Sequence, residues 1–200
     1  FKLTDKALHA VIEFYTKESG VRGLERTLAT LCRKADLILA KEQDTVVRVS
    51  DKNLPDFLGK KKFLFETIGK QDEVGIVTGL AWTQVGGDTL SVEVNIMPGI
   101  GKHELTGQLG DVMQESAKAA ISYVRANSEK LGIDTAFYKD KDIHIHAPEG
   151  AVPKDGPSAG VTMTTALVSA LTNRPVKPTV AMTGEISLRG NVLAIGGLKE

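Results

Sequence analysis

Ser158 is the residue whose type and surroundings most favour chemistry. It stands in the segment 148–160, Pro-Glu-Gly-Ala-Val-Pro-Lys-Asp-Gly-Pro-Ser-Ala-Gly, between an expected strand and an expected helix. Glycines and prolines restrict the chain before the serine, and Ala159 and Gly160 leave its hydroxyl uncrowded. The first N–H groups of the helix lie near such a hydroxyl and can stabilise an oxyanion. The pattern fits a nucleophile, and also the more common role of serine as a helix cap.

A nucleophilic serine needs a base, which can be a histidine, a lysine or a carboxylate. His144 and His146 are two residues apart on an expected strand, so their side chains share a face and could approach Ser158 or a metal ion. Zinc normally takes three or four protein ligands, and His103 is the available third imidazole. The alternative is that these histidines are structural or line a pocket.

The spacing of apolar side chains before residue 60 predicts mainly helices. Thr4 is placed to cap a first helix that Gly20 ends, and a second amphipathic helix follows. The expected later elements are the second helix at 21–41, a short strand at 46–49 and a short helix at 53–58. We therefore expect a small, mainly helical domain at 1–59 and a linker at 60–73.

From residue 74 the apolar pattern changes to a period of two, which predicts strands. Strands are expected at 74–83 and 89–97 around a turn at Gly86-Gly87-Asp88, at 142–147, and as a pair within 179–195 around Arg189-Gly190-Asn191. Helices are expected at 110–131, ended by Gly132, and at 158–172. Strands and helices mix without a regular repeat, so the predicted fold class is α+β, with a second domain at 74–200.

The charge balance gives no general sign of a nucleic-acid or anionic-lipid partner. The chain has 25 Lys and Arg against 25 Asp and Glu, with 42% hydrophobic residues. The two parts differ, because residues 1–62 carry 13 basic and 9 acidic side chains and residues 63–200 carry 12 and 16. This asymmetry favours two modules, and Lys60-Lys61-Lys62 is interpreted as part of a solvated linker.

Several classes of protein are disfavoured. Cys32 is the single cysteine and falls in the apolar stripe of the second helix, so no internal disulfide can form and a reducing, cytoplasmic setting is expected. No apolar run reaches the roughly 18 residues that span a bilayer, and no membrane partner is expected. The phosphate-binding Gly-x-x-x-x-Gly-Lys-Ser/Thr pattern does not occur.

The octapeptide Pro-Lys-Asp-Gly-Pro-Ser-Ala-Gly at 153–160 resembles the nucleophile motif of the Lon family, the ATP-dependent Ser–Lys proteases. Other segments are similar to signatures of the same protease domain and occur in the same order, at 77–83, 106–110 with 113–116, 144–150, 182–190 and 193–200. Residues 15–26 resemble the small helical subdomain that closes the Lon ATPase module. The resemblance implies a small helical AAA+ subdomain followed by a mixed α/β protease domain.

The resemblance also implies roles for individual residues. Ser158 would be the nucleophile, Thr183 would help to position the catalytic lysine, and Arg22 would be the sensor-2 arginine that touches nucleotide on the large ATPase subdomain. Glu185 and Asp155 would tune the site electrostatically. Without the family, Thr183 is a hydroxyl at the end of a strand, and Arg22, Glu185 and Asp155 are surface residues.

The catalytic lysine is the main departure from the family pattern. The family motif Gly-Gly-Leu-Lys-Glu continues with a second lysine that activates the serine, whereas the printed sequence ends at Glu200. Lys199 takes the first lysine position, and a neighbouring residue points in another direction, so Lys199 is not assigned as the base. We expect a fragment that lacks the dyad lysine and the last helices and is inactive alone.

The resemblance further implies the cofactors and partners of the whole protein. It would bind ATP and Mg²⁺ mainly outside this chain, form a homohexameric ring, and degrade misfolded or degron-bearing regulatory proteins, with no cofactor for the peptidase chemistry itself. The positively charged first part could contact DNA or polyphosphate weakly. The alternative is a non-catalytic module for assembly or for binding substrate or nucleic acid.

Overall fold

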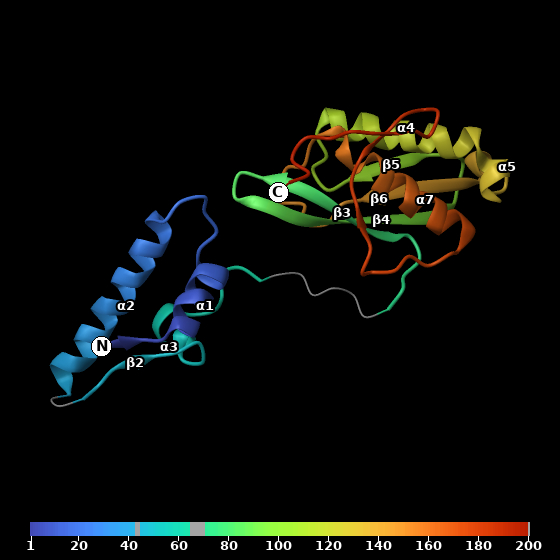
Figure 1. Cartoon of the computed structure of the whole chain (residues 1–200). Coiled ribbons are helices and arrows are strands. Elements are labelled where there is room, and N and C mark those ends of the chain that lie inside the picture. Colours follow the sequence, from blue (N-terminus) through green and yellow to red (C-terminus); the bar gives the residue numbers. More distant parts are fainter. Residues whose placement is uncertain (43–44, 65–70, 200) are drawn as a thin grey trace. The chain divides into compact units, whose positions relative to one another are not determined.

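The computed structural model describes residues 1–42, 45–64 and 71–199 (Figure 1). The chain divides into two compact units, the first with the elements from β1 to α3 and the second with those from β3 to β9. Residues 65–70 of the predicted linker lie outside the described residues.

The first unit is mainly helical. Its elements are β1 (Lys2–Leu3), α1 (Asp5–Tyr15), α2 (Arg22–Lys41), β2 (Arg48–Val49) and α3 (Leu54–Leu58). The predicted cap is confirmed, because Thr4 Oγ1 accepts a hydrogen bond of 3.2 Å from the N–H of Ala7. The predicted end at Gly20 is wrong: α1 stops at Tyr15 because Thr16 has an extended backbone, with φ −129° and ψ 138°.

The core of the first unit lies between α1, α2 and the β2–α3 segment. Its fully buried side chains include Val11, Leu31, Ala35 and Val49.

Cys32 is exposed, so its placement in the apolar stripe was wrong. One residue along a helix is a rotation of about 100°, which carries Cys32 from the buried side of Leu31 to the solvent side. Lys61 is not fully solvated, because its ammonium lies 3.3 Å from the centre of the Phe14 ring.

The second unit is an α+β domain, which confirms the predicted fold class. Its strands are β3 (Ile76–Thr83), β4 (Gly86–Pro98), β5 (His103–Thr106), β6 (Lys141–His146), β7 (Ala181–Met182), β8 (Glu185–Ile186) and β9 (Val192–Leu193). Its helices are α4 (Asp111–Ala126), α5 (Ser128–Leu131), α6 (Phe137–Asp140), the 3₁₀ turn η1 (Pro157–Ala159) and α7 (Gly160–Thr172).

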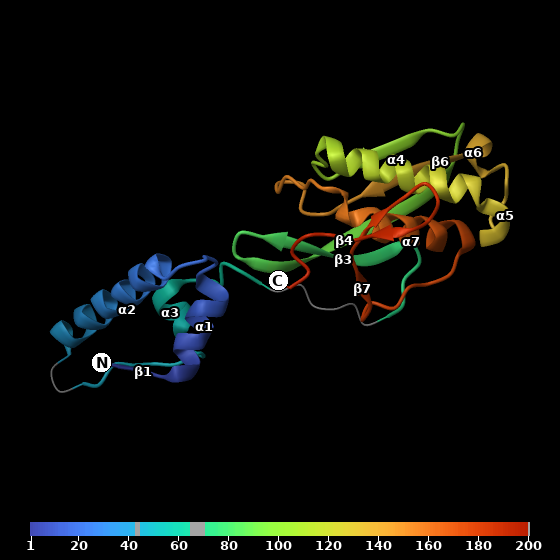
Figure 2. The ribbon, with the colours of Figure 1, turned by 45° about the horizontal axis from the view of Figure 1, so that its top comes forward.

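The main sheet has the strand order β5-β6-β4-β3-β7, and β8 pairs with β9 in a separate antiparallel hairpin. The pairs β5/β6 and β3/β7 are parallel, whereas β4/β6 is antiparallel. Helices α4 and α7 lie side by side (Figure 2) and form one core with the inward side chains of the strands. Ile143 and Ile145 of β6 belong to that core, so His144 and His146 project from the opposite face.

Two predicted boundaries in this unit differ from the structure. The β3–β4 turn is formed by Gln84 and Val85, and the predicted turn residues 86–88 begin β4. The helix predicted at 110–131 is broken at Asn127, whose side-chain amide donates to the carbonyl of Tyr123. Gly132 does end the second piece, in the left-handed conformation expected of a helix C-terminus.

Candidate active site

The serine loop, residues 147–157, leaves β6 and returns beside the segment that follows β5. At its start, the N–H of Ala147 donates to the carbonyl of Thr106 over 3.1 Å. At its end, the N–H of Lys154 donates to Gln108 over 3.1 Å, and the N–H of Gly110 donates to the carbonyl of Lys154 over 2.7 Å. Both ends of the loop are therefore fixed to one short segment.

Ser158 lies in η1, immediately before α7. The N-cap residue of α7 is Ala159, and no side chain caps either η1 or α7, so the structure does not support the role of Ser158 as a helix cap. Ser158 is half-buried, and its hydroxyl has no hydrogen-bond partner among the residues that the structure describes. The hydroxyl is therefore available for chemistry.

The backbone around Ser158 is fixed by residues from two other elements. The carbonyl of Ser158 accepts hydrogen bonds from the N–H of Gly184 at 2.7 Å and from the hydroxyl of Thr183 at 3.4 Å. The carbonyl of Pro157 accepts one from Ser116 Oγ of α4 at 3.1 Å. Thr183 and Ser158 thus come together, whereas Ser116, the last residue of the family-like segment 113–116, was given no role from the sequence.

Two glycines allow this close approach. Gly184 has φ +153°, and a Cβ there would lie 2.5 Å from Cγ1 of Val192. A Cβ on Gly160 would lie 2.8 Å from the backbone nitrogen of Ile186. A side chain at either position would therefore strain the packing of the strand pair β8/β9 against the serine turn, residues 157–159.

Asp155 has a structural role in this geometry. Its Oδ1 accepts hydrogen bonds from the N–H of Met113 at 3.0 Å and from that of Gly156 at 2.8 Å. A carboxylate at a helix N-terminus is stabilised by the N–H groups that have no partner within the helix. Asp155 therefore joins the serine loop to the first turn of α4, although the residue itself is exposed.

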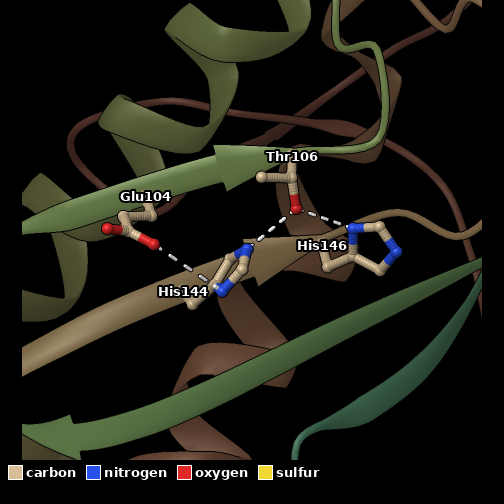
Figure 3. Close-up of polar contacts among 4 residues, drawn as sticks. All are labelled: Glu104, Thr106, His144 and His146. Atoms are coloured by element: carbon tan, nitrogen blue, oxygen red, sulfur yellow. Dashed lines mark hydrogen bonds and ion pairs between the residues drawn. The ribbon is translucent and has the colours of Figure 1, made fainter. Parts of the chain in front are cut away.

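The two histidines are bound to another residue, Thr106 (Figure 3). The Thr106 hydroxyl lies 2.8 Å from Nε2 of His144 and 2.7 Å from Nδ1 of His146. Glu104 Oε2 lies 3.9 Å from Nδ1 of His144. A hydroxyl carries one hydrogen, so at most one of the two short contacts is O–H···N and at least one is N–H···O. In the described part of the chain, neither imidazole hydrogen-bonds to Ser158.

The histidines do not assemble a metal site with His103. The parallel register pairs His103 with Ile143 and Glu104 with His144, which places His103 on the other face of the sheet. Among the described residues, no three His, Cys, Asp or Glu side chains are grouped so that they could hold a metal ion.

None of the remaining predicted residues forms a side-chain hydrogen bond with the Ser158 hydroxyl in the part of the chain that the structure describes. Arg22 is exposed in the first turn of α2, whose N–H groups at Gly23 and Leu24 are capped by the Glu18 carboxylate at 2.7 and 2.9 Å. Glu185 is half-buried in β8, and Lys199 is exposed. No hydrogen bond links Lys199 to Ser158 within the described ranges.

In the described part of the chain, two groups have clearly shifted pKa values, Asp142 and Tyr15. Backbone hydrogen bonds from Lys102 and Ile100, each 2.8 Å long, hold the pKa of Asp142 below its ordinary value. Burial raises the pKa of Tyr15, whose hydroxyl donates to the carbonyl of Gly59. Asp142 thereby fixes the turn between β4 and β5.

Comparison with known families covers the whole chain. Residues 48–200 match the Lon protease (S16) C-terminal proteolytic domain, and residues 1–47 match the Lon protease AAA+ ATPase lid domain. The chain belongs to the Lon protease family. The resemblance found in the sequence motifs is thereby confirmed, and the Lon proteolytic domain includes the serine loop, Ser158 and Thr183.

Full-length relatives agree with this assignment. The chain is 60% identical over 199 residues to Lon protease 1 of Bacillus subtilis (strain 168), 62% over 200 residues to a Lon protease of Finegoldia magna, and 60% over 196 residues to one of Clostridium acetobutylicum. These alignments cover 98 to 100% of this Lon family chain and 25 to 26% of the relatives. The chain therefore spans about a quarter of their length. In the described ranges, no helix is long and apolar enough to cross a membrane.

Proposed function

We propose that Ser158 is the nucleophile of an ATP-dependent endopeptidase of the Lon type. One observation supports this most directly: the Ser158 hydroxyl has no partner among the described residues, while the carbonyls of Pro157 and Ser158 are both fixed by hydrogen bonds. A nucleophile needs this combination of an available hydroxyl and a fixed backbone.

In this proposal, Ser158 Oγ attacks the carbonyl carbon of a peptide bond and gives its proton to a base. The N–H groups of Gly160 and Val161 already donate to Pro157 and Gly184, so the developing oxyanion would be met by N–H groups earlier in the turn. The tetrahedral intermediate then breaks its C–N bond, and the base returns the proton to the leaving amine, which departs as the first product. Water hydrolyses the resulting acyl-enzyme, which releases the second product and restores Ser158.

The base is proposed to be a lysine outside these 200 residues, as in the family pattern. Among the candidates within the described residues, the two histidines bind Thr106, and Lys199 is exposed without a hydrogen bond to Ser158. Thr183 would assist by fixing the serine turn on the side of β8, and Glu185 and Asp155 would contribute charge nearby.

For the complete protein, we propose ATP with Mg²⁺ as the energy source for unfolding substrates, and a homohexamer working in the cytoplasm on misfolded and degron-bearing proteins. Arg22 fits the role of a nucleotide sensor, because its side chain is exposed in a helix turn whose N–H groups Glu18 already caps. Nucleotide would supply the driving force for translocation, and the peptidase step itself would need no cofactor beyond Ser158 and its lysine base.

Casein cleavage tests this proposal. We would compare the 200-residue chain, a version extended through the next lysine and the C-terminal helices, and the extended version with Ser158→Ala. We expect cleavage only by the extended, serine-intact protein. Cleavage that survives Ser158→Ala would overturn the nucleophile, and cleavage by the 200-residue chain would place the base within it. Absence of cleavage by all three would favour a non-catalytic assembly or binding module.

A further inference from the structure

Lys154 makes an unusual set of contacts within the serine loop. Its ammonium donates hydrogen bonds to three backbone carbonyls, those of Gly107 at 3.2 Å, Glu149 at 2.9 Å and Val152 at 3.1 Å. An ammonium has three hydrogens, so all of its donors are used, and no lone pair is left to accept a proton from Ser158. Lys154 is therefore a binding group for the backbone and not the base.

The three carbonyls come from two separate segments. Gly107 follows β5, whereas Glu149 and Val152 form a turn of the serine loop that is closed by a 2.9 Å hydrogen bond from the N–H of Val152 to Glu149. Glu149 has φ +61°, a left-handed conformation that costs free energy for a residue with a side chain. The ammonium joins both segments and stabilises this strained turn through charge-assisted hydrogen bonds.

The positions between Lys154 and Ser158 are fixed one after another. The backbone of Lys154 is paired with Gln108 and Gly110, Asp155 caps α4, and the carbonyl of Pro157 binds Ser116. Because hydrogen bonds hold these positions, a displacement of Lys154 would be transmitted along the backbone to Ser158.

We propose that Lys154 is a positioning residue for Ser158, acting through the three carbonyls that its ammonium binds. The inference rests on the proposed function of Ser158 and names a further residue on which its geometry depends. Loss of the ammonium leaves the turn at 149–152 free to relax, so Ser158 is less often in the attacking geometry. We expect kcat to fall by about tenfold while KM changes little, because the substrate contacts are not removed.

A chemical rescue experiment tests whether the ammonium itself is responsible. In the extended, active protein with its cysteines replaced, Cys32→Ser included, Lys154→Cys is alkylated with 2-bromoethylamine, which restores an ammonium at nearly the same distance. Alkylation with bromoethane gives an uncharged side chain and serves as the matched control. Lys118→Met, at an exposed lysine of α4, controls for loss of a positive charge elsewhere.

We expect the aminoethyl adduct to recover kcat to within about twofold of the parent and the ethyl adduct to stay about tenfold lower. Equal kcat values for the two adducts, or a fully active Lys154→Met protein, would overturn the inference. Because both adducts come from one purified variant, a folding defect of the substitution affects them equally and leaves their comparison valid.

Amide hydrogen exchange separates this inference from the proposed function. In the 200-residue chain, Lys154→Met should speed exchange at Val152 and Gly110 and leave α7 unchanged. Unchanged exchange at both amides would overturn the role of the ammonium even if Ser158 is the nucleophile. An extended protein that still cleaves casein after Ser158→Ala would instead overturn the proposed function, and with it the link from Lys154 to catalysis.

Discussion

The serine turn and the histidine pair are close in sequence and opposite in their hydrogen bonding. Around Ser158 the backbone carbonyls are bound and the side-chain hydroxyl is left without a partner among the described residues. On β6 the side chains themselves are bound, because Thr106 joins both imidazoles. The hydrogen bonds therefore favour Ser158 over either histidine as the reactive group. A side chain without a hydrogen-bond partner on a fixed backbone is a better candidate for a reactive group than a side chain that is already hydrogen-bonded.

The largest expected effect is on casein cleavage, which should depend far more on Ser158 than on the histidine pair. Ser158→Ala should lower casein cleavage by the extended protein by about a thousandfold or more, whereas His144→Gln and His146→Gln should lower it by less than about tenfold. Initial rates at saturating casein measure both. A loss in either histidine variant as large as that of Ser158→Ala would remove the contrast and make the histidine a participant in the reaction.

Substitution of Gly184, whose N–H donates to the carbonyl of Ser158, should give the next largest effect. In Gly184→Ala, the new Cβ would meet Val192 at 2.5 Å with φ at +153°, so we expect a loss of about 2 kcal/mol in the free energy of unfolding. Urea denaturation measures the change. Gly150→Ala, in the serine loop, is the control, because its added Cβ would meet nothing within 4 Å. Equal losses for the two variants would contradict this account.

A smaller effect tests the histidine network. Thr106→Val removes the hydroxyl that both imidazoles share and should destabilise the chain by about 0.5 kcal/mol, a small value because the site is exposed. Thr106→Ser keeps the hydroxyl and should retain most of the stability. Nitrogen chemical shifts of His144 and His146 report the same change, since the hydroxyl contacts one ring nitrogen of each. Identical shifts in Thr106→Val and the parent would show that the network is not formed in solution.

The smallest effect concerns Asp142, on the same strand as the histidines. Its pKa is lowered by backbone hydrogen bonds from Lys102 and Ile100, so its contribution to stability is present above the ordinary carboxylate pKa and is lost as pH falls through the lowered value. Asp142→Asn should therefore weaken the dependence of stability on pH below about pH 4. Thermal unfolding from pH 5 to pH 2 tests this, and parallel curves for the two proteins would contradict it.

Much of the fold could be predicted from local patterns. The Thr4 cap, the alternation along β4 and β6, and the helix ends at Gly132 depend on residues within a few positions of one another. The errors occurred where local signals competed. Asn127 interrupts a continuous apolar stripe because its side chain binds the carbonyl of Tyr123, and α1 ends before its glycine because Thr16 is extended.

The candidate site likewise has features that the sequence predicts and contacts that only the structure shows. The sequence by itself determined the family, the motif around Ser158 and the faces on which side chains of the strands lie, because motifs and periodicity are local properties. Only the tertiary structure decided that Thr183 binds the carbonyl of Ser158, that Asp155 caps α4 and that Thr106 binds both histidines. These contacts join residues 25 to 42 positions apart. They depend on strand register and on where loops return, which no short segment of sequence specifies.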